Sequence, residues 1–360
     1  MKYPRPAFGD PNYTTTKHQM SAMFGGGTVD VPKPDYPIPI RENFRRAAKR
    51  AKPMWIPNGM TDIDSEMVAN LTGWGEADWS RKDRYEYIDQ FGCRWTFVPE
   101  AGGPMLTVGT RTLDDITEWP EKVKFPDLSQ YNIEERCAEF LKKHDPDKVL
   151  HINIGLGCTE RLVAVMGGYE DAMIAMAMEP KAVSDFLEAF VDSEIELVDE
   201  LLKYLPIDFI TYHDDWGTER DTFFGEQMME DIVFKPTLRL FEHIRSKNIV
   251  IQQHSCGRIK RFMPYFIKLG VDFLQIQERP NDFAAYKREY GRDIGIEVMA
   301  SPGRTKEELI AGIHKMIDTY AAHGGVFTNL FAFDPEMVWA GVWELYLYSR
   351  EYYDKENAES

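Results

Sequence analysis

The feature that most restricts the fold of this chain is a regular alternation of short apolar runs with amphipathic stretches, which begins near residue 149. The runs have the length and composition of buried strands, and they occupy residues 149–154, 209–213, 249–254, 273–277, 294–298 and 325–328. Between them, apolar residues recur every three or four positions, as at Val183, Phe186, Leu187 and Phe190. This alternation predicts right-handed βαβ units and a parallel sheet.

The number of predicted strands then selects the type of sheet. Together with a strand-like segment at residues 54–57, the six runs are too many for half a domain. They favour an α/β fold of the closed (β/α)₈ TIM-barrel type, in which one of the eight strands is poorly marked. An open doubly wound sheet is the alternative, although no glycine-rich phosphate-binding turn follows any of the runs.

The first 40 residues differ from the rest, because they contain seven prolines and three consecutive glycines at 25–27. This density of breakers predicts an irregular arm without a packed element, laid over the body, and a disordered tail is the alternative. The apolar residues Tyr13, Met20, Met23 and Phe24 favour the arm. We expect residues 41–360 to form one barrel domain, with a hairpin around the Gly-Gly-Pro turn at 102–104 and a surface connection at 116–128.

The chain is acidic, with a net charge of −17 from 42 basic and 59 acidic residues. Such a surface repels phosphate backbones and anionic lipid headgroups, so nucleic acid and membrane are poor partners. No run of 18 apolar residues occurs, and the N-terminus lacks the apolar core of a signal peptide. The four cysteines are far apart and form no CxxC pair, so we expect a reducing, cytoplasmic location.

Polar and titratable residues follow the predicted strands at the ends where (β/α)₈ barrels carry their chemistry. They are His213, Asp215, His254, Cys256, Asp214, Gln275, Gln277, Glu278 and Glu297. Helix N-caps explain some polar residues in such loops, Asp282 and Thr305 among them, but not the whole set. Because neighbouring parallel strands end side by side, we expect the first four residues of the set to converge on one cavity.

His254 and Cys256 lie two residues apart, so on an extended chain both side chains point the same way. Imidazole and thiolate are good zinc ligands, and the other three cysteines all lie upstream of residue 160. A third ligand would therefore be a carboxylate, with Glu297, Glu278 and Asp215 available. A hydrogen-bonded histidine beside a buried thiol is an equally good interpretation of the spacing.

Three motifs of this region resemble the uroporphyrinogen decarboxylase superfamily: His-Asp-Asp-Trp-Gly at 213–217, Ile-Gln-Gln-His-Ser-Cys-Gly-Arg at 251–258 and Leu-Gly-Val-Asp at 269–272. Their order and separation match, and so do Arg-Glu-Asn-Phe-Arg-Arg-Ala at 41–47 and Asp-Gln-Phe-Gly at 89–92. The resemblance covers about residues 41–350. It implies a single (β/α)₈ barrel with its site at the C-terminal ends of the strands, and a superfamily that contains both the haem-pathway decarboxylase and corrinoid-linked methyltransferases.

Two positions bear on the choice between these branches. Decarboxylase members carry an arginine-rich opening motif for the tetrapyrrole carboxylates, whereas residues 55–60 here read Trp-Ile-Pro-Asn-Gly-Met. Methyltransferase members use the His-x-Cys pair and a later cysteine as zinc ligands. This chain keeps His254 and Cys256 but reads Phe-Thr-Asn-Leu-Phe at 327–331, where the later cysteine would fall.

The resemblance therefore implies the demethylase type, which moves a methyl group from a small donor to the cobalamin of a separate corrinoid protein. We expect an aryl methyl ether as the donor. The chain has no Asp-x-His-x-x-Gly motif of the corrinoid carriers, so cobalamin would arrive on the partner. A decarboxylase, a methylcorrinoid:acceptor methyltransferase and a non-catalytic corrinoid or tetrapyrrole carrier are the alternatives.

The expected reaction assigns roles to residues. Aromatic and apolar side chains near the strand ends predict a pocket for an aromatic guest, although each could equally be barrel core: Tyr212, Trp216, Trp55, Met60 and Phe331. An aryl methyl ether breaks only when its oxygen is protonated or metal-bound. The catalytic residues His254, Asp215 and His213, or Glu297, could supply the proton. A zinc ion on His254, Cys256 and Glu297 could act instead as a Lewis acid.

Overall fold

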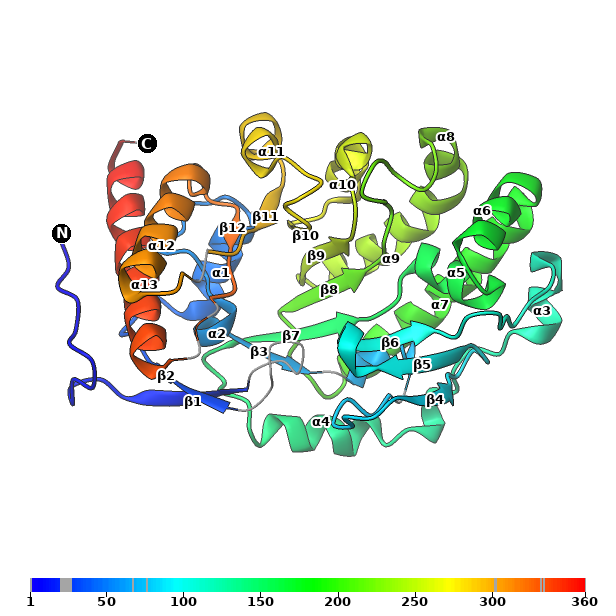
Figure 1. Cartoon of the computed structure of the whole chain (residues 1–360), viewed down its shortest axis with the longest axis horizontal. Coiled ribbons are helices and arrows are strands. Elements are labelled where there is room, and N and C mark those ends of the chain that lie inside the picture. Colours follow the sequence, from blue (N-terminus) through cyan, green and yellow to red (C-terminus); the bar gives the residue numbers. More distant parts are fainter. Residues whose placement is uncertain are drawn as a thin grey trace.

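Seven parallel strands form the central sheet, in the order β12-β11-β10-β9-β8-β7-β3 (Figure 1). The computed structural model describes residues 2–19, 28–66, 68–75, 77–300, 303–330, 332 and 334–359. The strands are β3 Ile63–Glu66, β7 Val149–Ile154, β8 Phe209–His213, β9 Val250–Ser255, β10 Phe273–Ile276, β11 Gly295–Glu297 and β12 Val326–Phe327. All six apolar runs predicted from the sequence are therefore strands of one sheet.

The sheet curls until its two edges approach each other. Asn58 forms a parallel bridge with Thr328 beyond β12, and the Thr328 amide donates to Pro57 O at 3.0 Å. From Asn58 the chain runs through α2 (Gly59–Asp62) directly into β3. Residues 54–57, which were predicted as a strand, do not form one: only the bridge at Asn58 occupies the eighth position, and β3 is the strand that the sequence did not mark. The fold is nevertheless the predicted (β/α)₈ TIM-barrel type.

Helices lie outside the sheet, and most follow a strand as predicted. They are α1 Ile40–Ala48, α4 Ile133–Leu141, α5 Cys158–Met166, α6 Tyr169–Met178, α7 Pro180–Leu201, α8 Glu226–Met228, α9 Phe234–Ser246, α10 Met263–Leu269, α11 Phe283–Tyr290, α12 Lys306–Tyr320 and α13 Pro335–Glu359. The predicted stripe of α7 is buried, and Asp282 and Thr305 cap α11 and α12 with their side chains. No helix of the described chain is both long and apolar enough to cross a membrane.

One end of the barrel is closed by an apolar floor. Phe44 of α1 packs against Phe209, Phe273 and Phe327, with ring centroids 5.0 to 6.0 Å apart, and all four rings are buried. Phe209 and Phe273 are the first residues of β8 and β10, so the floor lies at the N-terminal ends of the strands. The polar strand ends lie at the opposite, C-terminal mouth of the barrel.

A three-stranded antiparallel sheet precedes α4 and contains the predicted hairpin: β4 Tyr85–Ile88, β5 Arg94–Val98 and β6 Gly103–Leu106. The segment predicted as a surface connection is more compact than expected. It contains the short helix α3 (Trp119–Lys122) between two 3₁₀ turns, Ile116–Glu118 and Leu128–Gln130. Ile116, Val123 and Leu128 are buried in the main core, and the 3₁₀ turn at the start of the connection packs on α7.

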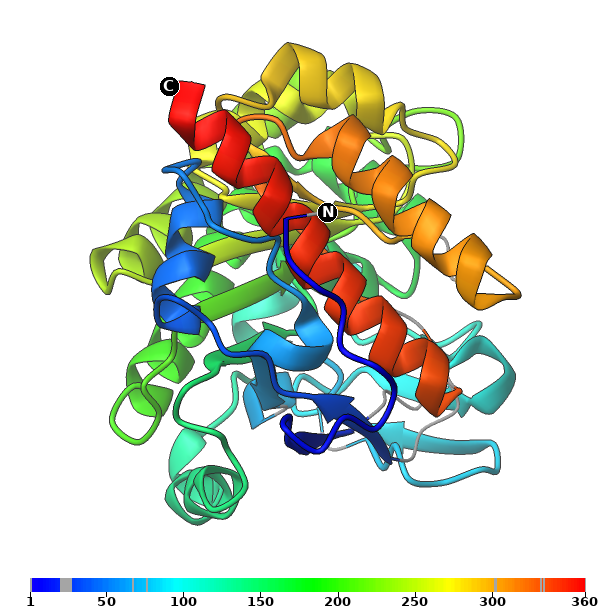
Figure 2. The ribbon, with the colours of Figure 1, turned by 90° about the vertical axis from the view of Figure 1, so that its left-hand side faces the viewer.

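The prediction of an arm without packed elements is wrong in one respect. Strands β1 (Thr15–Gln19) and β2 (Thr28–Pro32) pair as an antiparallel hairpin, and β2 packs against α13. Val31 is fully buried there, so strand pairing plus one apolar contact overcomes the local breakers. The arm does lie over the body: the N-terminal segment runs along α13 (Figure 2), and Arg5 donates to Glu344 of α13 through two nitrogens. Met20, Met23 and Phe24 fall outside the described residues.

Candidate active site

Strand alternation sorts the residues at the mouth into two groups. On β8, Thr211 and His213 face the barrel interior, whereas Tyr212 faces the surrounding helices. On β9, Gln252 and His254 face inward in the same way, with His254 directly opposite His213 in the register. The inward-facing polar residues therefore form layers above the apolar floor, and the uppermost layer contains both histidines.

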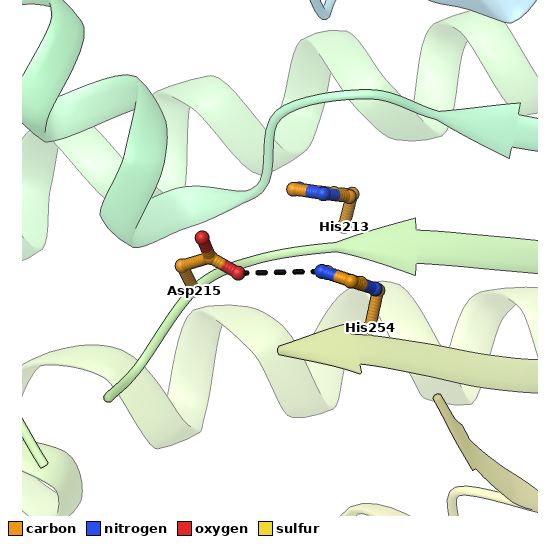
Figure 3. Close-up of side chains that lie close together, drawn as sticks. All are labelled: His213, Asp215 and His254. Carbon is orange, nitrogen blue, oxygen red and sulfur yellow. Dashed lines mark ion pairs between the residues drawn. The ribbon is translucent and has the colours of Figure 1, made fainter. Parts of the chain in front are cut away.

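The two histidines are the centre of a compact cluster (Figure 3). Their imidazole rings stack with centroids 4.0 Å apart and an interplanar angle of 11°. Asp215 Oδ1 lies 3.6 Å from His254 Nε2, and Cys256 Sγ lies 3.5 Å from the same nitrogen. The Cys256 amide also donates to Asp215 Oδ1 at 2.6 Å. The expected convergence of His213, Asp215, His254 and Cys256 is therefore what the structure shows.

Each imidazole is held from behind through Nδ1. His254 Nδ1 lies 2.8 Å from Gln275 Oε1 on β10, and His213 Nδ1 lies 2.7 Å from Glu160 Oε2 at the start of α5. The cluster keeps some access to solvent, since the side chains of His213, His254 and Asp215 are 20%, 17% and 15% exposed. The ring nitrogens not used for these contacts are therefore available to a ligand in the mouth.

Glu160 was missed by the sequence reasoning, although it contacts a predicted catalytic residue. Asp214, which faces outward from the sheet, accepts hydrogen bonds from the Thr159 and Glu160 amides and so caps α5. A side chain at Gly157 would meet Asp214, with Cβ atoms 2.5 Å apart, so glycine permits this close approach. The only signal in the sequence was a glutamate shortly after a predicted strand.

Burial determines the protonation states of the cluster. Burial, followed by the charge of His213, lowers the pKa of His254 to about 4, and burial also lowers the pKa of His213. Burial raises the pKa of the Cys256 thiol to about 12, and raises the pKa of Glu160 well above its usual value. At neutral pH the site thus presents neutral imidazoles, and a bound cation would favour the ionised thiol and carboxyls.

These donors fit a divalent metal ion. His213, Asp215 and His254 each offer a ligand atom, and these atoms lie within 4.8 Å of one another. When the hydrogen of the His254 ring is on Nδ1, Nε2 has none, and the Asp215 carboxylate then faces a nitrogen lone pair. A cation between the carboxylate and this nitrogen would stabilise the arrangement. Acceptors on the far nitrogen of each histidine are also typical of metal-binding imidazoles.

Glu297, predicted as the third metal ligand, is not part of this group. Its Oε2 accepts from Gln252 Nε2 at 2.7 Å and Gln275 Nε2 at 2.8 Å, and its Oε1 accepts from Asn329 Nδ2 at 2.7 Å. Three amides therefore hold this carboxyl in the layer below the histidines. Asp215 is the carboxylate that lies beside His254.

The four predicted substrate-binding residues that the structure describes lie in the core rather than in the mouth. Tyr212 and Trp216 are fully buried against helices: Tyr212 meets Phe241 edge-on, and Trp216 stacks on Phe266 at 4.8 Å. Because Tyr212 follows an inward-facing residue, alternation turns it outward.

Trp55 and Met60, the other two described residues of the predicted substrate pocket, are also buried in the core. Trp55 stacks on Tyr36 at 4.6 Å and donates its indole N–H to Asp62, and Met60 is buried in the cluster formed with α12 and α13. Both belong to the segment that closes the barrel. Phe331 lies outside the described residues.

Other aromatic side chains lie near the cluster. Trp74 meets His213 edge-on, with ring centroids 5.3 Å apart. Tyr169 stacks on Phe223 at 4.4 Å, and burial, followed by the charges of Glu160 and Asp215, raises its pKa. Their positions in loops and at a helix start carry no periodic signal, so the sequence alone did not single them out.

Comparison with known proteins identifies the family. The family description "Uroporphyrinogen decarboxylase (URO-D)" matches residues 87–327, about two thirds of the chain. A solved methyltransferase from Methanosarcina mazei is similar in fold, with a TM-score of 0.63, 13% identity and coverage of 88% of this chain and 99% of that chain.

The catalytic domain of the GH26 endo-beta-1,4-mannanase from Bacillus sp. JAMB-750 is much less similar. Its TM-score is 0.37 at 9% identity, with coverage of 86% of this chain and 90% of that chain. No curated protein sequence matches the chain. The family match covers well over half of the residues and agrees with the barrel and its polar mouth, so the chain belongs to the uroporphyrinogen decarboxylase (URO-D) family.

Proposed function

We propose that this protein is a methyltransferase that moves the methyl group of a small methoxylated aromatic compound to the cobalamin of a separate corrinoid protein. The observation that carries the proposal is the cluster of His213, Asp215, His254 and Cys256 at the barrel mouth. Membership of the URO-D family and a fold similar to that of a methyltransferase support a transferase of this type.

The charges around the cluster favour methyl transfer over decarboxylation of a tetrapyrrole. A polycarboxylate substrate needs arginine or lysine side chains close to its acid groups. Among the described residues, the side chains that pair with the two histidines or pack edge-on against them are Glu160, Asp215, Gln275, Cys256 and Trp74, and none is cationic. A small neutral ether is not repelled by the two carboxyls.

We further propose zinc as the metal, with His254, Asp215 and Cys256 as its ligands. Thiolate and imidazole suit zinc, and three protein ligands leave one position open for the substrate oxygen. Zinc bound there would act as a Lewis acid on the ether oxygen as the aryl oxide leaves.

The residues of the chain contribute orientation and exclusion of water. Gln275 holds the His254 ring and Glu160 holds the His213 ring, while the Cys256 amide fixes one oxygen of Asp215. Trp74, which lies against His213, offers an aromatic wall for the substrate ring. Cobalamin would be presented to the mouth by the partner protein.

The direct test is methyl transfer from a panel of methoxyphenols to cob(I)alamin, followed by its absorbance, with zinc-loaded and exhaustively chelated protein. We expect turnover that is lost on chelation and restored by zinc. Cys256→Ser should lower zinc affinity strongly, because a hydroxyl is a much poorer ligand than a thiolate. Release of carbon dioxide from a tetrapyrrole carboxylate, without methyl transfer from any ether, would instead establish a decarboxylase.

A further inference from the structure

A continuous chain of hydrogen bonds crosses the barrel interior below the candidate site. It begins at Ser65 on β3, passes through residues of β7, β8, β9, β11 and β10, and ends at His254. Its members after Ser65 are His151, Thr211, Gln252, Glu297, Gln275 and His254. The mechanism above uses only the last two of these residues.

The direction of each hydrogen bond near His254 follows from Glu297. A carboxylate can only accept, so the amide groups at 2.7 and 2.8 Å from Oε2 must be the NH₂ groups of Gln252 and Gln275. The carbonyl oxygen of Gln275 then faces His254 Nδ1 at 2.8 Å and can only accept. Nδ1 of His254 therefore carries the hydrogen, and Nε2 presents its lone pair to the mouth.

The same reasoning gives the opposite result at the other end. The carbonyl oxygen of Gln252 accepts from the Thr211 hydroxyl at 2.8 Å, which uses the single hydrogen of that hydroxyl. Thr211 Oγ1 must then accept from His151 Nε2 at 2.8 Å. His151 Nδ1 is left without hydrogen and accepts from the Ser65 hydroxyl at 2.9 Å.

We propose that Glu297 fixes the tautomers of both histidines, because every hydrogen bond in the chain donates toward its carboxylate. His254 is held with hydrogen on Nδ1 and His151 with hydrogen on Nε2. Gln275 and Glu297 are thus positioning residues: they keep His254 Nε2 free of hydrogen and open to a metal ion in the mouth.

The protonation of the His151 ring supports this inference. Burial lowers the pKa of His151 to about 3, so this ring is neutral at pH 7, while the tautomer of His254 rests on the hydrogen bonds alone. A neutral imidazole has one hydrogen on one nitrogen, and its position is then decided by the neighbouring donors and acceptors. The use made of the free Nε2 rests on the proposed function, but the tautomers do not.

The tautomers can be read directly by long-range ¹H–¹⁵N NMR of metal-free protein with ¹⁵N-labelled histidine. The chain has eight histidines, and His254→Asn and His151→Gln variants assign the two signals. We expect the Nδ1–H pattern for His254 and the Nε2–H pattern for His151. The Nε2–H pattern at His254, or the same tautomer at both positions, would overturn the proposal without any further variant.

Variants then test the role of Glu297. Glu297→Gln should produce a mixture of His254 tautomers and lower Zn²⁺ affinity about 10- to 100-fold in competition with a chromophoric chelator. The double variant Gln275→Glu/Glu297→Gln places a carboxylate next to His254, with an amide behind it, and should restore the Nδ1–H tautomer. If Glu297→Gln leaves both tautomer and Zn²⁺ affinity unchanged, or the double variant restores neither, Glu297 does not set the tautomer.

Gln253→Leu is the matched control, since this buried glutamine lies on the same strand as His254 but has no hydrogen-bond partner for its side chain among the described residues. It should change neither tautomer nor Zn²⁺ affinity. Both readouts are independent of catalysis. A protein that shows the expected tautomers and binds zinc but transfers no methyl group would reject the proposed function and leave this inference standing.

Discussion

The polar residues on the inward and outward faces of β8 and β9 have different structural roles. Inward, Thr211 donates to Gln252 on the neighbouring β9, and His213 stacks on His254 of the same strand and keeps contact with solvent. Outward, Tyr212 and Asp214 are fully buried between the sheet and the helices. The inward residues form the candidate site, whereas the outward residues place the elements around it.

The outward network shows how this placement is achieved. Tyr212 Oη accepts from the Cys158 amide at 2.8 Å, and Asp214 accepts from the next two amides of α5. These contacts fix the start of α5 and thereby bring Glu160 to His213. A polar residue at a strand end is therefore insufficient evidence for a catalytic role, because its face decides which role it has.

The largest expected effect lies on the inward face. His254→Ala should lower the rate of methyl transfer by at least about 10²–10⁴-fold, because it removes the nitrogen around which Asp215 and Cys256 gather. The measurement is turnover of a methoxyphenol with cob(I)alamin. His243→Ala is the control, since His243 also pairs with an aspartate, at 2.9 Å, but on the outer helix α9. Wild-type turnover of His254→Ala would move the catalytic role elsewhere.

On the outward face we expect a loss of stability instead. Trp216→Ala should lower the free energy of unfolding by about 3–5 kcal/mol, because a fully buried indole leaves a cavity beside Phe266 and Phe262. Urea unfolding measures the change. Trp216→Phe keeps the stacked ring and removes only the indole donor to Asp214, so it should cost clearly less. Equal losses for the two variants would contradict a packing role.

The pH dependence of stability sharpens the contrast, because His151 faces inward and is half-buried. Its pKa is lowered from 6.5 to about 3 by burial, so below pH 6.5 the unfolded chain takes up a proton that the folded protein does not. This contribution is complete above pH 6.5 and falls by about 1.4 kcal/mol per pH unit as the pH decreases toward 3.

His151→Gln should therefore lose less stability than the wild type between pH 6.5 and pH 4.5, since glutamine can keep both neighbours but does not titrate. Urea unfolding of both proteins at several pH values gives the difference, in which the contributions of the other histidines cancel. Parallel curves for the two proteins would show that folding does not lower the pKa of His151.

The smallest effect is expected at Gln253, the outward neighbour of His254. Both polar atoms of its buried side chain lack a partner within the described structure. Gln253→Leu should leave the free energy of unfolding unchanged or raise it by about 1 kcal/mol, because an unsatisfied amide is replaced by an apolar group of similar size. Gln252→Leu, one residue earlier and inward, should be destabilising, since it leaves Glu297 without one donor. The reverse order would show that the two faces are assigned wrongly.

The sequence by itself determined the six strands after residue 149, their order along the chain and the helices between them. Apolar runs and 3.6-residue stripes depend on near neighbours, and so do the caps at Asp282 and Thr305. The residues at 213–215 and 254–256 could be placed at one mouth because parallel strands share a direction. The alternation of side chains along the strand also predicts that Tyr212 points outward, although its aromatic ring had suggested a place in the substrate pocket.

Only the tertiary structure decided which of the available partners meet. His213 contacts Glu160, 53 residues earlier, and His254 contacts Gln275, 21 residues later, so neither pairing has a local signature. Asp215 rather than Glu297 lies beside His254, because Glu297 sits one layer lower among three amides. Local periodicity specifies the face of a residue, whereas its contacts depend on the register between strands and on the start of each following helix, which the packing of the whole barrel sets.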